Sequence, residues 1–130
     1  LKLDAITEAQ LARLAVEGIG ETKTLEYKQA LTFVTDEQKR ELLSDLAALA
    51  NTDGGDLVFG MAAEKGVATE LIGLKNFVAD EAIGRIENLL RDFVQPRIAG
   101  VVFRVLPLVN GNQVLLIRVP RSFSSPHMIR

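Results

Sequence analysis

One stretch of this chain, residues 46–60, limits the possible folds more than any other. It reads LAALANTDGGDLVFG, which is an apolar helix end, a polar turn with a pair of glycines, and a hydrophobic run that ends on glycine. Asn, Asp and Gly tolerate the positive φ angles that tight turns need. A continuous apolar run such as Leu57–Phe59 is typical of a strand buried on both faces. The pattern therefore predicts a helix joined by a tight turn to the central strand of a sheet.

The turn itself is interpreted as structural rather than as a ligand site. Its residues are Asn51, Thr52, Gly54 and Gly55. The sequence contains no Gly-x-x-x-x-Gly-Lys-Ser/Thr phosphate loop. The turn also follows the C-terminus of a helix, where the helix dipole disfavours anions.

Local signals place the remaining elements. Thr7–Gln10 and Thr35–Gln38 each read as a capping box that opens a helix, and Gly18 can end the first of these. Further predicted elements are an extended piece at 24–30, a helix capped by Asp80 and closed by Pro96, and a hairpin of 101–109 with 113–119 around an Asn-Gly-Asn turn. We expect an α+β fold with a mixed β-sheet, about three helices and a C-terminal β-hairpin.

Composition sets the class of protein. A chain of 130 residues with 48% hydrophobic residues is expected to form a single globular domain. The absence of cysteine excludes disulfides and thiolate metal sites, and no apolar run reaches the roughly 20 residues of a membrane helix. We therefore expect a cytoplasmic protein that does not enter a membrane. Because the sequence does not begin with Met, we also expect a fragment of a longer chain.

The net charge of −2 hides an asymmetry. Residues 1–92 carry 10 basic and 17 acidic side chains, whereas residues 93–130 carry five arginines and no acid. One interpretation is a basic surface for an anionic polymer, and the other is that the two segments neutralise each other in the fold. The candidate nucleic-acid contacts are Lys28, Arg97, Arg104, Arg118 and Arg121.

The hairpin arginines depend on the strand register. A loop of residues 110–112 would pair Val109 with Gln113 and place Arg104 opposite Arg118. Like charges in that position repel unless an anion such as a phosphate chain lies over them. A shorter, two-residue loop would put the two arginines on opposite faces.

Glu21, Glu26 and Lys28 form a second constellation. Carboxylates near a lysine can bind a divalent cation or move protons in phosphodiester cleavage, but they are also typical of a salt-bridged, solvated strand face. Strand alternation separates positions 21 and 26 unless Glu21 lies in the preceding loop. His127 is the single histidine, and we interpret it as a surface or packing residue.

These motifs together resemble the Schlafen-type AlbA domain over roughly residues 20–127. The segment ETKTLEYK at 21–28 is similar to the family's Glu-x-x-x-x-Glu-Phe-Lys element. The segment ALANTDGGDLVFG at 48–60 is similar to the family's Asn-Thr-x-Gly-Gly block. The resemblance implies an α+β fold and nucleic-acid binding. It also implies a division into an N-terminal helix at 1–19 and the AlbA-like domain at 20–130.

The resemblance implies two kinds of activity. Prokaryotic members usually head a longer transcriptional regulator with an ATPase-like or winged-helix portion, whereas paired copies in animal Schlafens cleave structured RNA with three acids. Two of these acids correspond to Glu21 and Glu26. The third is expected near 60–64, where the chain reads GMAAE and Glu64 is the nearest substitute.

Three functional hypotheses follow. The first is a non-catalytic DNA- or RNA-binding module of a prokaryotic regulator, which needs no cofactor. The second is a Mg²⁺- or Mn²⁺-dependent nuclease with Glu21, Glu26, Lys28 and Glu64 as its catalytic residues. The third is a dimerisation or interaction domain, a homodimer, that serves an ATPase on the same chain.

Overall fold

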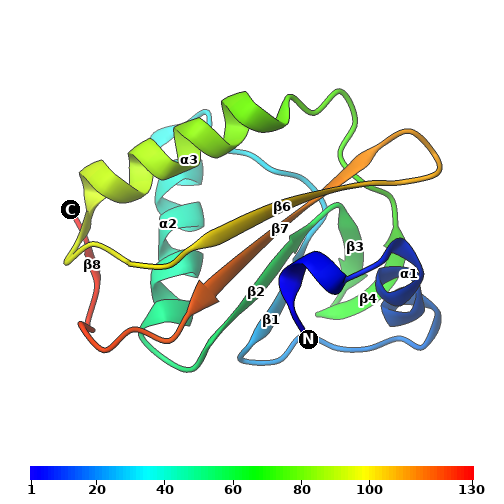
Figure 1. The fold of residues 1–130 in the computed structure, drawn as a ribbon, viewed down its shortest axis with the longest axis horizontal. Helices are drawn as coiled ribbons and strands as arrows, with labels where there is room; N and C mark the ends of the chain where they lie inside the picture. Colours follow the sequence, from blue (N-terminus) through cyan, green and yellow to red (C-terminus); the bar gives the residue numbers. More distant parts are fainter.

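A computed structural model describes residues 1–130, which fold into helices packed on a central sheet (Figure 1). The helical elements are η1 (Leu3–Ala5), α1 (Glu8–Val16), α2 (Asp36–Ala50) and α3 (Ala79–Phe93). The strands are β1 (Leu25–Lys28), β2 (Gly54–Phe59), β3 (Met61–Glu64), β4 (Val67–Leu71), β5 (Val94–Gln95), β6 (Val102–Pro107), β7 (Gln113–Pro120) and β8 (Met128–Ile129). The expected α+β class is confirmed.

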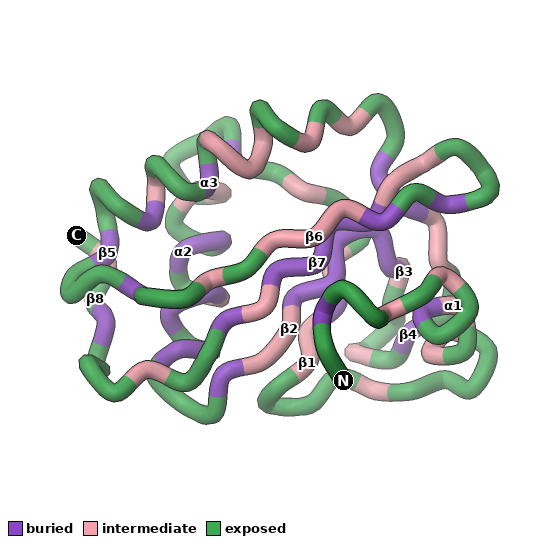
Figure 2. Tube along the Cα trace, in the orientation of Figure 1, coloured by how far each residue is buried: buried purple, intermediate pink, exposed green.

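The main sheet has the strand order β1-β2-β7-β6, with β1 parallel to β2 and the other pairs antiparallel. Its two faces are covered differently. The helices α2 and α3 pack on one face, whereas η1, α1 and the β3–β4 hairpin lie over the other (Figure 1). Figure 2 shows the buried residues concentrated along β2, β7 and the inner side of α2.

The predicted central strand is confirmed in its details. Leu57 and Phe59 belong to the core beneath α2 and α3, and Val58 belongs to the core on the opposite face. Both capping boxes also form, because Thr7 accepts from the backbone of Gln10 and Thr35 from that of Gln38. None of the helices combines the length and apolar character of a membrane-spanning segment.

The turn before β2 is a close approach of backbones. Gly54 and Gly55 have φ angles of +76° and +152°, and a Cβ on Gly55 would overlap the carbonyl group of Thr24. Asn51 ties the turn to the C-terminal tail, since its Oδ1 accepts from His127 N at 2.7 Å and its Nδ2 donates to His127 O at 3.1 Å. The structural interpretation of this turn is therefore supported by its contacts.

His127 is a packing residue. Its side chain is buried, its Nδ1 donates to the carbonyl of Pro96, and its Nε2 lies 2.6 Å from Ser122 Oγ. The tail continues as β8, which pairs with β5 at the end of α3.

Several predicted boundaries were wrong. Asp80 does not cap α3, because the helix begins at Ala79 with Val78 before it and no side chain caps its end. The helix stops at Phe93, since Val94 pairs with Ile129 instead of continuing the helical stripe. The β3–β4 hairpin and β8 were not predicted, because these short strands gain their order from packing against distant segments.

Neither of the two hairpin registers considered from the sequence forms. Pro107 pairs with Gln113, so Arg104 lies opposite Leu116 and Arg118 lies opposite Val102. The two arginines share one face of the ribbon, as the three-residue loop would place them, but they are offset rather than directly opposed.

Candidate functional site

Glu21 and Glu26 line one hollow of about 420 Å³ between β1 and α2, together with Asp45 of α2. Glu21 precedes β1, which lets it converge with Glu26 despite strand alternation. Glu64 ends β3, is exposed and does not line this hollow.

Lys28 occupies the centre of a carboxylate cluster. Its Nζ lies 3.0 Å from Asp45 Oδ2, 3.6 Å from Glu41 Oε1 and 3.7 Å from Glu26 Oε1. Burial alone would lower the lysine pKa, but the hydrogen bond with Asp45 and the charges of the three carboxylates outweigh it, so the pKa is raised. Lys28 is therefore an internal counter-charge.

The carboxylates of the hollow have distinct environments. Burial, followed by repulsion from Asp45, raises the pKa of Glu26, and Lys28 only partly offsets this. Glu21 Oε2 accepts from the backbone N of Tyr27 at 2.8 Å. Glu21 thus shapes the start of β1, and burial followed by the charge of Glu21 raises the pKa of Tyr27.

A metal ion does not fit these residues well. No group of three or more Asp, Glu or His side chains has an arrangement that could hold one. In the acidic hollow the ammonium of Lys28 already lies against Asp45 and Glu26, and Glu21 is hydrogen-bonded to backbone. The carboxylates of this hollow are therefore engaged within the protein.

The hairpin arginines hold the N-terminal segment against the sheet. Arg118 donates to Asp56 through Nε at 2.8 Å and Nη2 at 2.9 Å, and its Nη1 donates to Leu1 O at 2.6 Å. The hydrogen bond with Asp56 raises the arginine pKa. Arg104 Nη1 donates to the carbonyls of Leu3 and Ile6. These guanidinium groups are engaged inside the domain.

Among the predicted nucleic-acid contacts, Arg97 and Arg121 remain exposed and have no carboxylate partner. Both side chains are exposed and neither has a carboxylate within 4.0 Å. Arg121 lies over the exposed ring of Phe123, with its Cζ 5.9 Å from the ring centroid. The structure does not gather the predicted cations on one open face, and their role in binding stays a prediction.

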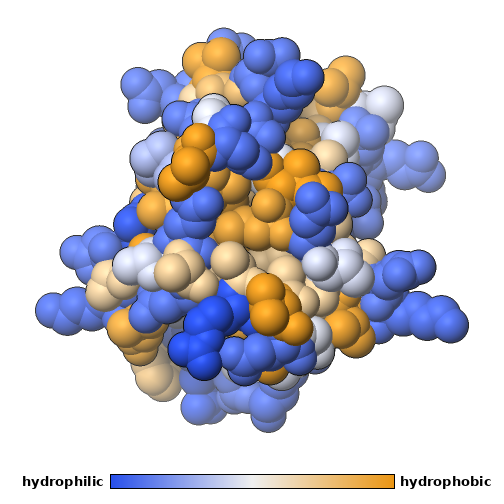
Figure 3. All heavy atoms as spheres, turned by 90° about the vertical axis from the view of Figure 1, so that its right-hand side faces the viewer, coloured by the Kyte–Doolittle hydropathy of each residue, from blue (hydrophilic) through white to orange (hydrophobic).

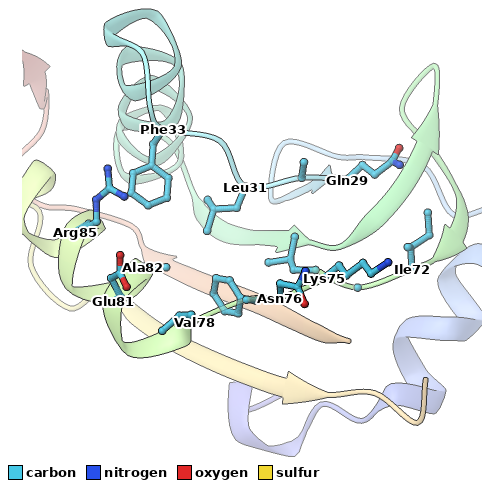
Figure 4. A pocket seen from close by; sticks show the side chains of 14 residues that line it. Gln29, Leu31, Phe33, Ile72, Lys75, Asn76, Val78, Glu81, Ala82 and Arg85 are labelled. Carbon is cyan, nitrogen blue, oxygen red and sulfur yellow. The ribbon is translucent and has the colours of Figure 1, made fainter. Parts of the chain in front are cut away.

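A different group of cations lies around α3 and the first turns of α2. We call this region the α2–α3 seam, and it consists of two hollows. The larger, of about 500 Å³, is lined by Gln29, Ala30, Leu31, Phe33, Ile72, Gly73, Leu74, Lys75, Asn76, Phe77, Val78, Glu81, Ala82 and Arg85 (Figure 4). The smaller, of about 240 Å³, is lined by Asp36, Lys39, Arg40, Leu43, Leu89, Phe93, Ile129 and Arg130.

The two hollows are neighbours along α3. Arg85 of the larger and Leu89 of the smaller are four residues apart on α3, so they lie one turn apart on one face. Across the seam, Phe33 of the larger hollow precedes α2, and Asp36 of the smaller hollow is the first residue of α2. The two hollows therefore adjoin each other along α3.

The seam is cationic. Its lining holds Lys39, Arg40, Lys75, Arg85 and Arg130 against Asp36 and Glu81, and none of the five cations has a carboxylate within 4.0 Å. Sequence reasoning missed these residues. The adjacent pair Lys39-Arg40 beside the apolar stripe of α2 was the available signal, but nothing local indicated which helix would face it.

A sequence profile of the family described as "Schlafen, AlbA_2" matches residues 21–129. No curated protein matches the chain.

Solved structures share the fold. The N-terminal domain of a "Putative ATP-dependent DNA Helicase RecG-related Protein" from Nitrosomonas europaea is similar, with a TM-score of 0.60 and 20% identity over 85% of this chain and 72% of that one. The DIP2311 protein from Corynebacterium diphtheriae has a TM-score of 0.54 and 20% identity, and the match covers 92% of this chain but 22% of that protein.

Proposed function

Since the chain belongs to the Schlafen AlbA_2 family, we propose that it is a nucleic-acid-binding module, non-catalytic by itself, of a prokaryotic transcriptional regulator. The similar domain from Nitrosomonas europaea comes from a protein described as related to a DNA helicase, and this description supports a role in binding DNA. By the same analogy, the module works together with an ATPase or winged-helix portion.

The observation that carries the proposal is the excess of unpaired cations along the α2–α3 seam. The domain has a net charge of −2, yet the seam holds five cations and two acids. Cations that lack internal partners can release counterions from a phosphate chain when they bind it. The seam is therefore the interface, and the exposed Arg97 and Arg121 are secondary contacts.

The acidic hollow does not compete as an interface. Its carboxylates would repel a phosphate chain, and the one cation at its centre, Lys28, already faces Asp45, Glu41 and Glu26. Nucleic acid is expected to approach from the side of the seam.

The proposal is tested by fluorescence anisotropy of a labelled duplex and a labelled single strand across a salt series. The double variant Lys39→Ala/Arg40→Ala should weaken binding and lower the slope of log K against log salt by about one to two units, roughly one per lost phosphate contact. The matched control, Arg13→Ala/Lys65→Ala, removes the same charge from α1 and from the β3–β4 turn.

The control should keep the slope of the unaltered protein. Failure of the domain to retain either nucleic acid at about 50 mM salt would overturn the proposed function, since phosphate contacts are strongest at low salt. Equal loss in the two double variants would remove the seam as the interface.

A further inference from the structure

We propose that the larger hollow of the α2–α3 seam receives one unpaired nucleobase of a bound strand, an inference that rests on the proposed function. The hollow has a volume of about 500 Å³, within the range of small-molecule sites and larger than a single base needs. Its lining combines an apolar floor, an arginine against an aromatic ring, and polar groups able to read the edge of a base.

The floor of the hollow is apolar and comes from segments far apart in the sequence. Leu31 precedes α2, whereas Leu74 and Phe77 belong to the connection between β4 and α3. A planar base gains from leaving water against such a surface. The amide and carboxylate groups of Gln29, Asn76 and Glu81 line the same hollow and supply donors and acceptors.

Arg85 provides a stacking surface. Its Cζ lies 4.5 Å from the centroid of the Phe33 ring, so the guanidinium covers a ring that is itself buried. Arg85 remains exposed, which leaves its other face for a ligand. Unpaired bases stack on arginine planes as well as on aromatic rings, and the contact with Phe33 orients this plane in advance.

The charges lie at opposite ends of the floor. Figure 4 shows Arg85 beside Phe33 at one end of the hollow and Lys75 toward the other end. A nucleotide presents phosphate on either side of its base, so this spacing suits a base on the floor with its backbone drawn to Lys75. The smaller hollow, one helical turn along α3, continues the cationic strip for the next phosphates.

The wall of the hollow is fixed before any ligand arrives. Asn110 Nδ2 and Asn112 Nδ2 both donate to Ile72 O, at 3.1 Å and 2.9 Å, and Leu74 N donates to Gln113 O at 2.6 Å. The β6–β7 turn thus anchors the segment that carries Lys75 and Phe77. Figure 3 shows hydrophobic residues gathered on the face at this end of the molecule, with hydrophilic residues around them. A preorganised wall lowers the cost of binding.

The test compares a perfect duplex with the same duplex carrying one bulged 2-aminopurine, using the 130-residue protein. The bulged duplex should bind about tenfold more tightly, which is the scale of one stacking contact, and its 2-aminopurine fluorescence should change on binding. The variant Arg85→Lys keeps the positive charge but lacks the planar guanidinium group on which a base could stack. It should abolish the preference for the bulged duplex over the perfect duplex.

Each other outcome decides against the inference. Equal binding of the two duplexes without a fluorescence change would overturn the pocket and leave the proposed function in place. Binding of neither duplex at low salt would overturn both. A preference that survives Arg85→Lys would place the base elsewhere, and saturable binding of free dAMP with equal affinity would assign the hollow to a free nucleotide.

Discussion

The two flanks of α2 carry charge in opposite ways. On one flank Glu41 and Asp45 face Lys28, which contacts both carboxylates. On the other flank Lys39 and Arg40 line the smaller hollow with no carboxylate within 4.0 Å. Both flanks border the same buried apolar stripe, so the helix separates an acidic surface from a basic one.

The difference lies in what each charge faces. Asp45 Oδ2 is buried and has the Lys28 ammonium as its charged neighbour, so that pair contributes to folding. Lys39 is half-buried and Arg40 is exposed, and neither has a carboxylate within 4.0 Å. These two charges therefore contribute little to stability and remain able to bind an anion. A charged residue in a motif is therefore a functional candidate only when the fold leaves it unpaired.

The largest expected effect comes from removing the lysine of the acidic flank. Lys28→Met should lower the free energy of unfolding by about 2 kcal/mol, less than for a fully buried pair because Lys28 is partly exposed. The raised pKa of Lys28 has the same meaning, since a lysine whose pKa is raised by folding stabilises the protein at every pH below its unfolded pKa. Urea unfolding at pH 7 measures the change.

The matched control for this variant is Arg40→Met, an exposed residue on the basic flank of the same helix. It should change the free energy of unfolding by no more than about 0.5 kcal/mol, as for other unpaired surface residues. Similar losses in the two variants would break the distinction between the flanks.

An intermediate effect is expected at the end of α2. Asn51→Ala removes both side-chain hydrogen bonds to the backbone of His127 and should cost about 1 kcal/mol of stability. Because the tail carries Ile129 and Arg130 into the smaller hollow, the variant should also weaken nucleic-acid binding. Thermal unfolding and the anisotropy assay report the two effects, and Thr52→Ala on the same turn serves for comparison. Binding that is unchanged in a destabilised Asn51→Ala would show that the basic flank works without the tail.

The smallest effect concerns pH and Glu26. Its raised pKa means that the folded protein takes up a proton more readily than the unfolded chain, so the contribution of Glu26 to stability falls as pH rises from its ordinary value of 4.5 through the raised value. Glu26→Gln should remove this decline and raise the free energy of unfolding at pH 7 by roughly a few tenths of a kcal/mol. Denaturant unfolding from pH 4 to pH 7 measures it, with Glu37→Gln on the exposed side of α2 as control. If the stability of the unaltered protein rose more steeply with pH than that of Glu26→Gln, the prediction would have the wrong sign.

Local patterns were sufficient for much of the fold. The capping boxes at Thr7 and Thr35 each start a helix, because the hydrogen bonds that define them join residues three apart. The apolar run at Leu57–Phe59 indicated burial on both faces, and the glycines after Asn51 indicated the tight connection to β2. The end of α3 was misplaced, because the pairing of Val94 with Ile129 joins segments that no local pattern relates.

The sequence by itself determined the family, the α+β class, the helix starts and the central strand, since these depend on residue type and short-range spacing. Only the tertiary structure decided which charges are available. It placed Lys28 among carboxylates, joined Arg118 to Asp56, and left Lys39, Arg40 and Arg85 unpaired beside an apolar floor. The physical reason is that the energetic contribution of a charge depends on its partners and its burial. Both are determined by segments that are distant in the chain.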